Sequence, residues 1–227
     1  MSDSKNSPGF FRQSRIVARR DLKRESRHGE ILLVTLPFGG IALLLVPLAI
    51  GTDTETLHRI GPGMFWVIVM LFGVFGAVRQ SNAETSSQHD LVALIGLDPA
   101  AVFIGQATAT FLLLVVFEVV LGVAAIVMYD LTPVGWGVLV AVVLLVAVGL
   151  SLLGTLAAGI ASSSRSATAL VPLLVAPMSV PLLLGATQSH EAIRLGRSSL
   201  AWVLMMTIIV LLLAVVGVLS ARTIQEI

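Results

Sequence analysis

The ionisable side chains that could do chemistry in this chain are few, and several of them lie in one polar stretch. The stretch runs from Arg79 to Pro99, RQSNAETSSQHDLVALIGLDP, in a 227-residue chain that is 56% hydrophobic and 12% charged. Its first part carries Arg79, Glu84, His89 and Asp90, and its second part carries Leu91, Val92, Leu94 and Ile95. This order predicts a short amphipathic surface helix that ends at a glycine and a turn. Such a helix can rest on lipid or dock on a soluble partner.

Motifs for catalysis or metal binding are missing from the sequence. The chain has no cysteine, which excludes disulfides, thiolate metal sites, covalent haem attachment and cysteine nucleophiles. It also has no phosphate-binding loop of the G-x-x-x-x-G-K-[ST] type, no acidic metal cluster and no nucleophile with a base nearby. We therefore expect no catalytic residue, no metal site, no directly bound cofactor, no enzymatic activity of the chain's own and no nucleic-acid partner.

One carboxyl group interrupts an apolar stretch near its middle. Glu118 lies in LLLVVFEVVLG, where an ionised side chain is costly and by default marks a functional or packing site. The alternative is a protonated acid that hydrogen-bonds to a neighbouring helix. No second buried ionisable residue is available to form a proton relay with it.

Two histidines, His58 and His190, fall in the expected outer loops. Such a pair could ligate haem iron, although solitary loop histidines are more often solvated.

Hydrophobic stretches determine the fold class. Most reach the roughly 20 residues needed to cross a hydrocarbon core, so we predict an all-α polytopic membrane protein with both termini on one side. We place the six crossings at Glu30 to Ile50, Gly63 to Val78, Ala101 to Met128, Val134 to Ala161, Ala167 to Thr187 and Ser199 to Ala221. The second crossing is short unless Arg79 reaches back to the interface.

Residues 1–29 form a separate basic segment before the transmembrane domain of residues 30–227. Apolar residues recur in this segment at helical spacing, which predicts an amphipathic helix lying on the anionic inner face of the membrane. A disordered basic tail is the alternative. The segment's basic residues are Lys5, Arg12, Arg15, Arg19, Arg20, Lys23, Arg24 and Arg27.

The basic residues also indicate orientation. Eleven of the 14 lysines and arginines fall on one side of the six crossings, and only Arg59, Arg194 and Arg197 fall on the other. The positive-inside rule then makes both termini and the 79–99 stretch cytoplasmic. Aromatic residues at the expected outer ends agree with this orientation, because such rings favour the interface. They are Trp66, Trp136, Trp202 and Tyr129.

Two crossings have unusual compositions. The fourth has small residues at four-residue intervals, including Ala147, Ser151 and Thr155, with Gly154 and Ala158 in a second row, and such ridges allow close helix approach. The fifth contains three prolines, which predict a kinked or broken helix. They are Pro172, Pro177 and Pro181.

Four segments in this order resemble the haem exporter protein B family. They are GPGMFWVIVMLFGVFGAVRQSNAET, DLVALIGLDPAAVFIGQ, FLLLVVFEVVL and LVPLLVAPMSVPLLL. The resemblance implies an ABC-2-like exporter permease of the bacterial inner membrane, working in cytochrome c maturation.

The same resemblance implies partners. A separate ABC ATPase subunit, in two copies with two permeases, would bind ATP and Mg²⁺, and a haem-handling membrane subunit and a haem chaperone would take part. The complex would either export haem, which would then be its substrate, or release a haem-loaded chaperone; the resemblance does not decide between the two. The loop residues that match the family's ATPase-coupling loop are Arg79, Glu84, Leu91, Leu94 and Pro99, and we assign Asp90 to the same loop. Glu118 matches the family's intramembrane acid.

Two other functions compete with this interpretation. A permease of another ABC exporter, for lipid, drug or ion, would share the loop and the six helices. A secondary transporter would instead need an inverted internal repeat and paired charges at the midplane, and the sequence has neither.

Overall fold

The computed structural model describes residues 9–28, 30–51, 53–83, 97–131, 135–161 and 167–223, and every regular element in these ranges is a helix. Six helices are long and apolar enough to cross a membrane, so the prediction of an all-α polytopic membrane protein is confirmed. The helices are α1 (Phe10–His28), α2 (Glu30–Ile50), α3 (Thr54–Ala83), α5 (Pro99–Met128), α6 (Trp136–Ala161), α7 (Ala167–Arg194) and α8 (Leu200–Thr223).

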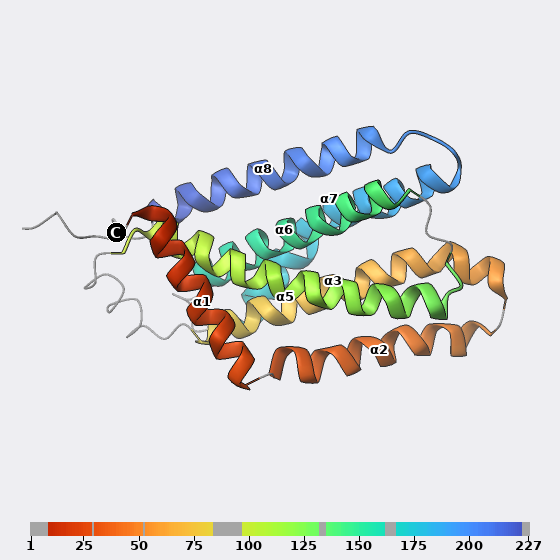
Figure 1. Cartoon of the computed structure of the whole chain (residues 1–227), viewed down its shortest axis with the longest axis horizontal. Coiled ribbons are helices and arrows are strands. Elements are labelled where there is room, and N and C mark those ends of the chain that lie inside the picture. Colours follow the sequence, from red (N-terminus) through yellow and green to blue (C-terminus); the bar gives the residue numbers. More distant parts are fainter. Residues whose placement is uncertain are drawn as a thin grey trace, which may run out of the picture.

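The six long helices lie lengthwise beside one another, with α2 and α8 at opposite margins of the bundle (Figure 1). The short helix α1 crosses the bundle at one end (Figure 1). We call this the loop end, because α3 ends there at Ala83 and α5 begins there at Pro99. The opposite end holds the last residues of α2, α5 and α7.

Helix α6 lies at the centre of the bundle and packs against α3, α5, α7 and α8. Small residues let its neighbours approach, as the sequence predicted. A Cβ atom on Gly154 would lie 3.1 Å from the Cβ of Ala77 in α3, and one on Gly149 would lie 2.5 Å from a methyl carbon of Leu182 in α7. Ala147, Ser151, Thr155 and Ala158 are all buried on this helix. Since lipid provides no hydrophobic contrast, such close approach is what holds membrane helices together.

The predicted second crossing was too short. Helix α3 extends from Thr54 to Ala83, well beyond the apolar stretch from Gly63 to Val78. Hydropathy marks only the apolar part of a helix, whereas this helix continues through polar turns at both ends. The side chain of Asp53 accepts a hydrogen bond from the Thr56 hydroxyl, and the Asp53 carbonyl accepts one from the backbone N–H of Leu57. The helix therefore begins with a polar first turn.

Helix α7 also runs further than predicted, to Arg194. It is continuous through Pro172, Pro177 and Pro181, so the helix is not broken into two. The other alternative, a kink at these residues, stays a prediction.

Candidate functional site

The two ends of the predicted coupling loop lie at the loop end of the bundle. Arg79 is in the last turns of α3, and Pro99 is the first residue of α5. Between them, residues 84–96 lie outside the described residues, and these include Glu84, Asp90, Leu91 and Leu94. The structure thus shows where the last turns of α3 and the start of α5 lie, from which the loop extends.

The start of α5 is firmly capped. Asp98 has an extended backbone, with φ −65° and ψ 122°, and its Oδ1 accepts a hydrogen bond of 2.9 Å from the backbone N–H of Ala100. Pro99 follows at the first helical position, where its missing N–H costs nothing. This cap fixes the direction in which the chain enters α5 from the loop.

Helix α1 packs directly on this start of α5. The backbone N–H of Asp98 donates a 2.8 Å hydrogen bond to Oε1 of Gln13, whose side chain is only 5% exposed. A Cβ atom on Gly105 would lie 2.7 Å from the carbonyl oxygen of Ser14 and 2.7 Å from Cβ of Val17. The two helices can approach this closely only because residue 105 has no side chain.

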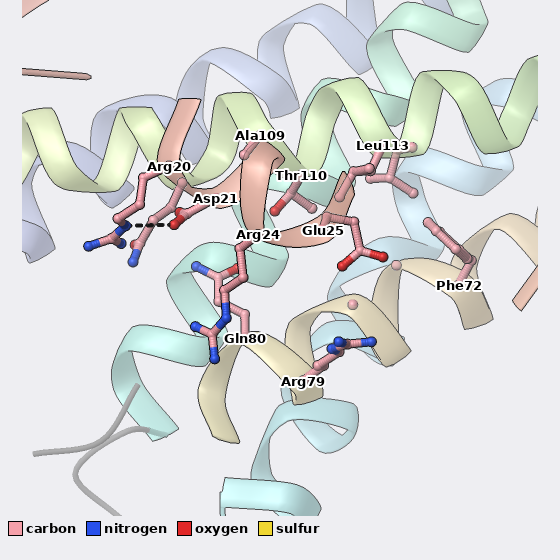
Figure 2. A pocket seen from close by; sticks show the side chains of 14 residues that line it. Arg20, Asp21, Arg24, Glu25, Phe72, Arg79, Gln80, Ala109, Thr110 and Leu113 are labelled. Carbon is pink, nitrogen blue, oxygen red and sulfur yellow. Dashed lines mark hydrogen bonds and ion pairs between the residues drawn. The ribbon is translucent and has the colours of Figure 1, made fainter. Parts of the chain in front are cut away.

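A cavity of 140 Å³ lies between α1 and the other end of the loop (Figure 2). Arg79 and Gln80 of α3 line it together with Phe72, which is part of its apolar lining. The remaining polar lining comes from Gln106 and Thr110 of α5 and from Arg20, Asp21, Arg24 and Glu25 of α1.

Two acidic residues of α1 differ in their surroundings within this cavity. Arg20 Nε donates to Oδ1 of Asp21 over 2.9 Å at the exposed rim. Glu25 is buried, and Figure 2 shows its carboxylate on the side of α1 that faces Arg79. Helix α1 thus has polar side chains at both ends of the loop, an arrangement that the sequence analysis missed. The small residues Ala101, Gly105 and Ala109, spaced four apart, predict a close helix contact, but their spacing does not indicate that α1 is the partner.

A larger cavity, of 390 Å³, lies in the opposite half of the bundle. Its lining is mainly apolar and comes from four helices, with Trp66 from α3, Glu118 from α5, Trp136 from α6, and Ser189 and His190 from α7. Part of this lining is also exposed on the face of the bundle that would meet lipid: Val119, Val123 and Val140 are each more than half exposed. An apolar cavity with a few polar groups is the usual form of a small-molecule site.

Glu118 is the most unusual group in this cavity. Its side chain is 1% exposed, and neither carboxyl oxygen has a hydrogen-bond partner among the described residues. The alternative that the sequence left open, a hydrogen bond from this acid to a neighbouring helix, is therefore absent among the described residues. A buried polar group without a partner costs stability, so Glu118 is not explained by the packing of this chain alone. Ser189 Oγ, in the same lining, is also buried and unpaired among the described residues.

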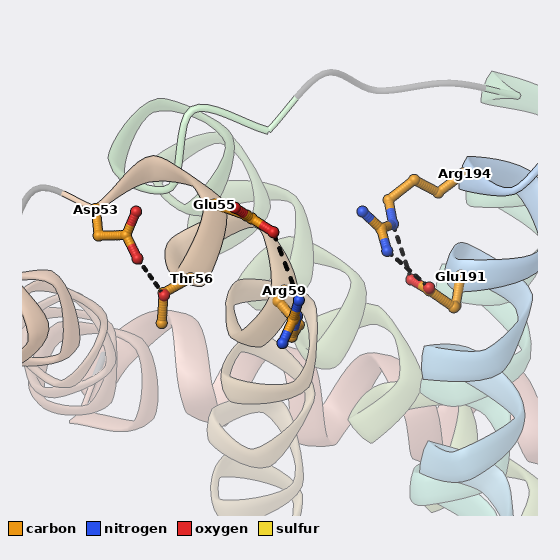
Figure 3. A network of polar contacts seen from close by, with 6 residues as sticks. All are labelled: Asp53, Glu55, Thr56, Arg59, Glu191 and Arg194. Atoms are coloured by element: carbon orange, nitrogen blue, oxygen red, sulfur yellow. Dashed lines mark hydrogen bonds and ion pairs between the residues drawn. The ribbon is translucent and has the colours of Figure 1, made fainter.

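Charged residues of α3 and α7 gather at the opposite end of the bundle (Figure 3). Arg194 donates two hydrogen bonds to Glu191, of 2.9 and 2.8 Å, and Arg59 lies 3.6 Å from Glu55. Both pairs are within one helix and largely exposed, so each contributes little to stability.

Neither histidine of interest lies in a loop, contrary to the sequence prediction. His58 is in the second turn of α3, and His190 is in the last turns of α7. Both helices are longer than their apolar stretches, which is why these residues are helical. His190 lines the larger cavity, whereas His58 has its Nε2 at 3.9 Å from a carboxyl oxygen of Asp130.

Two of the four aromatic residues taken as interfacial are instead buried. Tyr129 is fully buried, and its hydroxyl donates a 3.0 Å hydrogen bond to the carbonyl oxygen of Leu43. Trp66, in the middle part of α3, is also buried, and its ring contacts that of Phe65. Trp136 is exposed and Trp202 is partly exposed. The aromatic argument for orientation therefore loses half of its support, and the distribution of basic residues remains.

The fold defines a multi-pass membrane protein, with the two ends of the 79–99 stretch at one end of the bundle and an apolar cavity towards the other. Comparison with known proteins gives the family. The chain matches the family described as CcmB protein over residues 12–225, and it belongs to that family.

Curated relatives cover most of the chain. It is 32% identical to Heme exporter protein B of Paracoccus denitrificans over 183 residues, which are 78% of this chain and 80% of the relative. It is 27% identical to the proteins of the same name from Bradyrhizobium diazoefficiens, over 81% of this chain and 83% of the relative, and Pseudomonas aeruginosa, over 89% of each.

Proposed function

We propose that this chain is the membrane permease subunit of an ABC transporter for cytochrome c maturation. A separate ATPase subunit, in two copies with two permeases, binds ATP and Mg²⁺ and drives either haem export or the release of a haem-loaded chaperone. The observation that carries the proposal is the family match across residues 12–225, together with relatives named Heme exporter protein B.

In this proposal the 79–99 loop contacts the ATPase. Leu91 and Leu94 supply the apolar contact, while Arg79, Glu84, Asp90 and Pro99 fix the loop between α3 and α5. Support comes from the geometry at the end of the loop, since α5 begins at a capped, hydrogen-bonded turn. If the loop is held rigidly at its ends, its displacement can tilt α3 and α5.

Movement of the loop by the ATPase could reach the larger cavity through α3 and α5. Helices α3 and α5 carry the two ends of the loop, and both also line the cavity in the opposite half of the bundle. A tilt of either helix would change the shape of the cavity without any contact between the ATPase and the cavity itself. We propose that Glu118 serves this cycle, because its burial without a partner among the described residues is a cost that packing does not repay.

The proposed location is the bacterial inner membrane, with both termini and the loop in the cytoplasm. The basic residues favour this orientation, because α1, Arg79 and Arg222 are at the loop end whereas Arg59, Arg194 and Arg197 are at the other. Helix α1 would then lie on the anionic leaflet with its exposed arginines against lipid headgroups.

The proposal is tested by purifying the chain from its native membrane in mild detergent. Co-purification of an ABC ATPase, a haem-handling membrane subunit and a haem chaperone is expected, and ATP should release the chaperone or move haem. An ATPase from a lipid, drug or ion exporter, found in place of these partners, would assign the chain to another transport system.

A further inference from the structure

We propose that α1 is a positioning element for the 79–99 loop. It braces the two ends of the loop against each other, and the loop passes force to α3 and α5 only while α1 is seated on the bundle. The coupling part of this inference rests on the proposed function. The bracing part rests on this chain alone: on a hydrogen bond and close packing at α5, and on a cavity shared with α3.

The first contact is at the point where the loop joins α5. Gln13 is buried, and its Oε1 accepts the 2.8 Å hydrogen bond from the backbone N–H of Asp98. Asp98 in turn caps α5 through Ala100. One side chain of α1 thus holds the residue that sets the direction of the loop at this end.

The second contact seats α1 along α5. At Gly105 the backbone of α1 comes so close that a single added carbon would lie 2.7 Å from the Ser14 carbonyl oxygen. The nearest obstacle is backbone and a β-branched side chain, Val17, rather than the flexible tip of a long side chain. The seat therefore has no room for even a methyl group.

The third observation is a shared cavity at the point where the loop leaves α3. Glu25 is buried and lines the smaller cavity with Arg79 and Gln80 (Figure 2). Residues 13 and 25 of one helix are about 18 Å apart at the usual rise of about 1.5 Å per residue. One helix thus accepts a hydrogen bond at the α5 end of the loop and lines a cavity together with residues of the α3 end.

A brace of this kind has a mechanical consequence. Coupling between distant sites travels through rigid, packed elements. If α1 is seated, a push on the loop moves α3 and α5 as a set. If α1 is lifted, the two ends can shift independently, and the push is absorbed at the loop.

The test compares two helical Gly-to-Ala variants that differ in what the new methyl group meets. Gly105→Ala places it against α1, whereas Gly63→Ala in α3 places it where nothing lies within 4 Å. Both changes favour a helix equally. Gln13→Leu is a second variant, which removes the acceptor for Asp98 without adding bulk at the seat.

The first readout is the distance between the two ends of the loop. Because the chain has no native cysteine, Asn82→Cys and Leu97→Cys provide two specific sites for spin labels. We expect a narrow distance distribution in the parent protein and in Gly63→Ala, and a broadened or shifted one in Gly105→Ala and Gln13→Leu. This measurement needs no ATPase.

The second readout uses the complex. Gly105→Ala and Gln13→Leu should retain the ATPase in a pull-down but lose the part of its activity that depends on the permease, while Gly63→Ala keeps it. Unchanged distances in both variants would overturn the brace. Broadened distances with full permease-dependent activity would overturn its role in coupling. If the parent chain retains no ATPase, the proposed function fails, and the distances alone still decide whether α1 braces the loop.

Discussion

Glu118 gives the sharpest test of whether a residue in this chain is kept for function rather than for stability. It is 1% exposed in a mainly apolar lining, and both of its oxygens are unpaired among the described residues. An unsatisfied buried polar group costs about 1–3 kcal/mol. Glu118→Leu removes the polar group and nearly conserves volume, so it should raise the free energy of unfolding of the isolated chain by about 1–3 kcal/mol.

The same substitution should abolish function if the acid serves the transport cycle. Glu118→Gln is the matched control, because it keeps the shape and a hydrogen-bonding group while it cannot carry a charge. Its stability should stay close to that of the parent. If Gln is functional and Leu is not, the cycle uses Glu118 as a hydrogen-bonding group; if neither is functional, it uses the acid itself.

Both properties can be measured on one set of samples. Thermal unfolding in detergent gives the stability, and complementation of cytochrome c maturation in cells gives the activity. A gain in stability with a loss of function is the predicted result. A Glu118→Leu protein that is clearly less stable than the parent would refute the reasoning, because it would mean that the carboxyl group makes a structural hydrogen bond. Parental behaviour of both variants in cells would remove Glu118 from the functional site.

Three further predictions concern other parts of the chain. Tyr129→Phe should lower the free energy of unfolding by about 1 kcal/mol in the same thermal assay, because it removes the buried hydrogen bond to the Leu43 carbonyl oxygen; an unchanged value would mean that this bond is replaced. The Thr56 hydroxyl lowers the pKa of Asp53 by its hydrogen bond, so Thr56→Val should raise that pKa towards its ordinary value. The stability that this lowered pKa provides is present above the unfolded-state pKa and is lost as the pH falls through the folded-state pKa. The variant should therefore be less stable than the parent at neutral pH and equally stable in strong acid. An equal loss of stability at both pH values would contradict this cause. Finally, protease added to right-side-out vesicles should spare residues 1–29, and cleavage there would reverse the proposed orientation.

The six crossings could be predicted from the sequence because the signal is local. A run of about 20 apolar residues reports its own burial in lipid. The ends of the helices were harder to predict, since the mostly polar segments Thr54 to Arg59 and Arg79 to Ala83 continue α3 outside the apolar stretch. Hydropathy does not distinguish such turns from loops.

The contacts between elements could not be predicted because they join distant parts of the chain. Gln13 and Asp98 are 85 positions apart, and nothing near either residue names the other. Tyr129 has the amphipathic side chain of an interfacial residue, but its hydroxyl finds a buried carbonyl oxygen 86 positions away. Burial of an aromatic ring depends on which helices surround it, and composition alone does not contain that information.

The central claim is that the 79–99 loop joins this permease to an ATPase, and a pull-down with the Leu91→Asp, Leu94→Asp double variant tests it most directly. Each change would put a charge into a desolvated contact, and each lost anchor typically costs about 2 kcal/mol or more. The account predicts that the variant inserts into the membrane normally, as checked on the same sample, but no longer retains the ATPase that the parent chain retains. Retention of the ATPase by the inserted variant at the parent's stoichiometry would contradict the account.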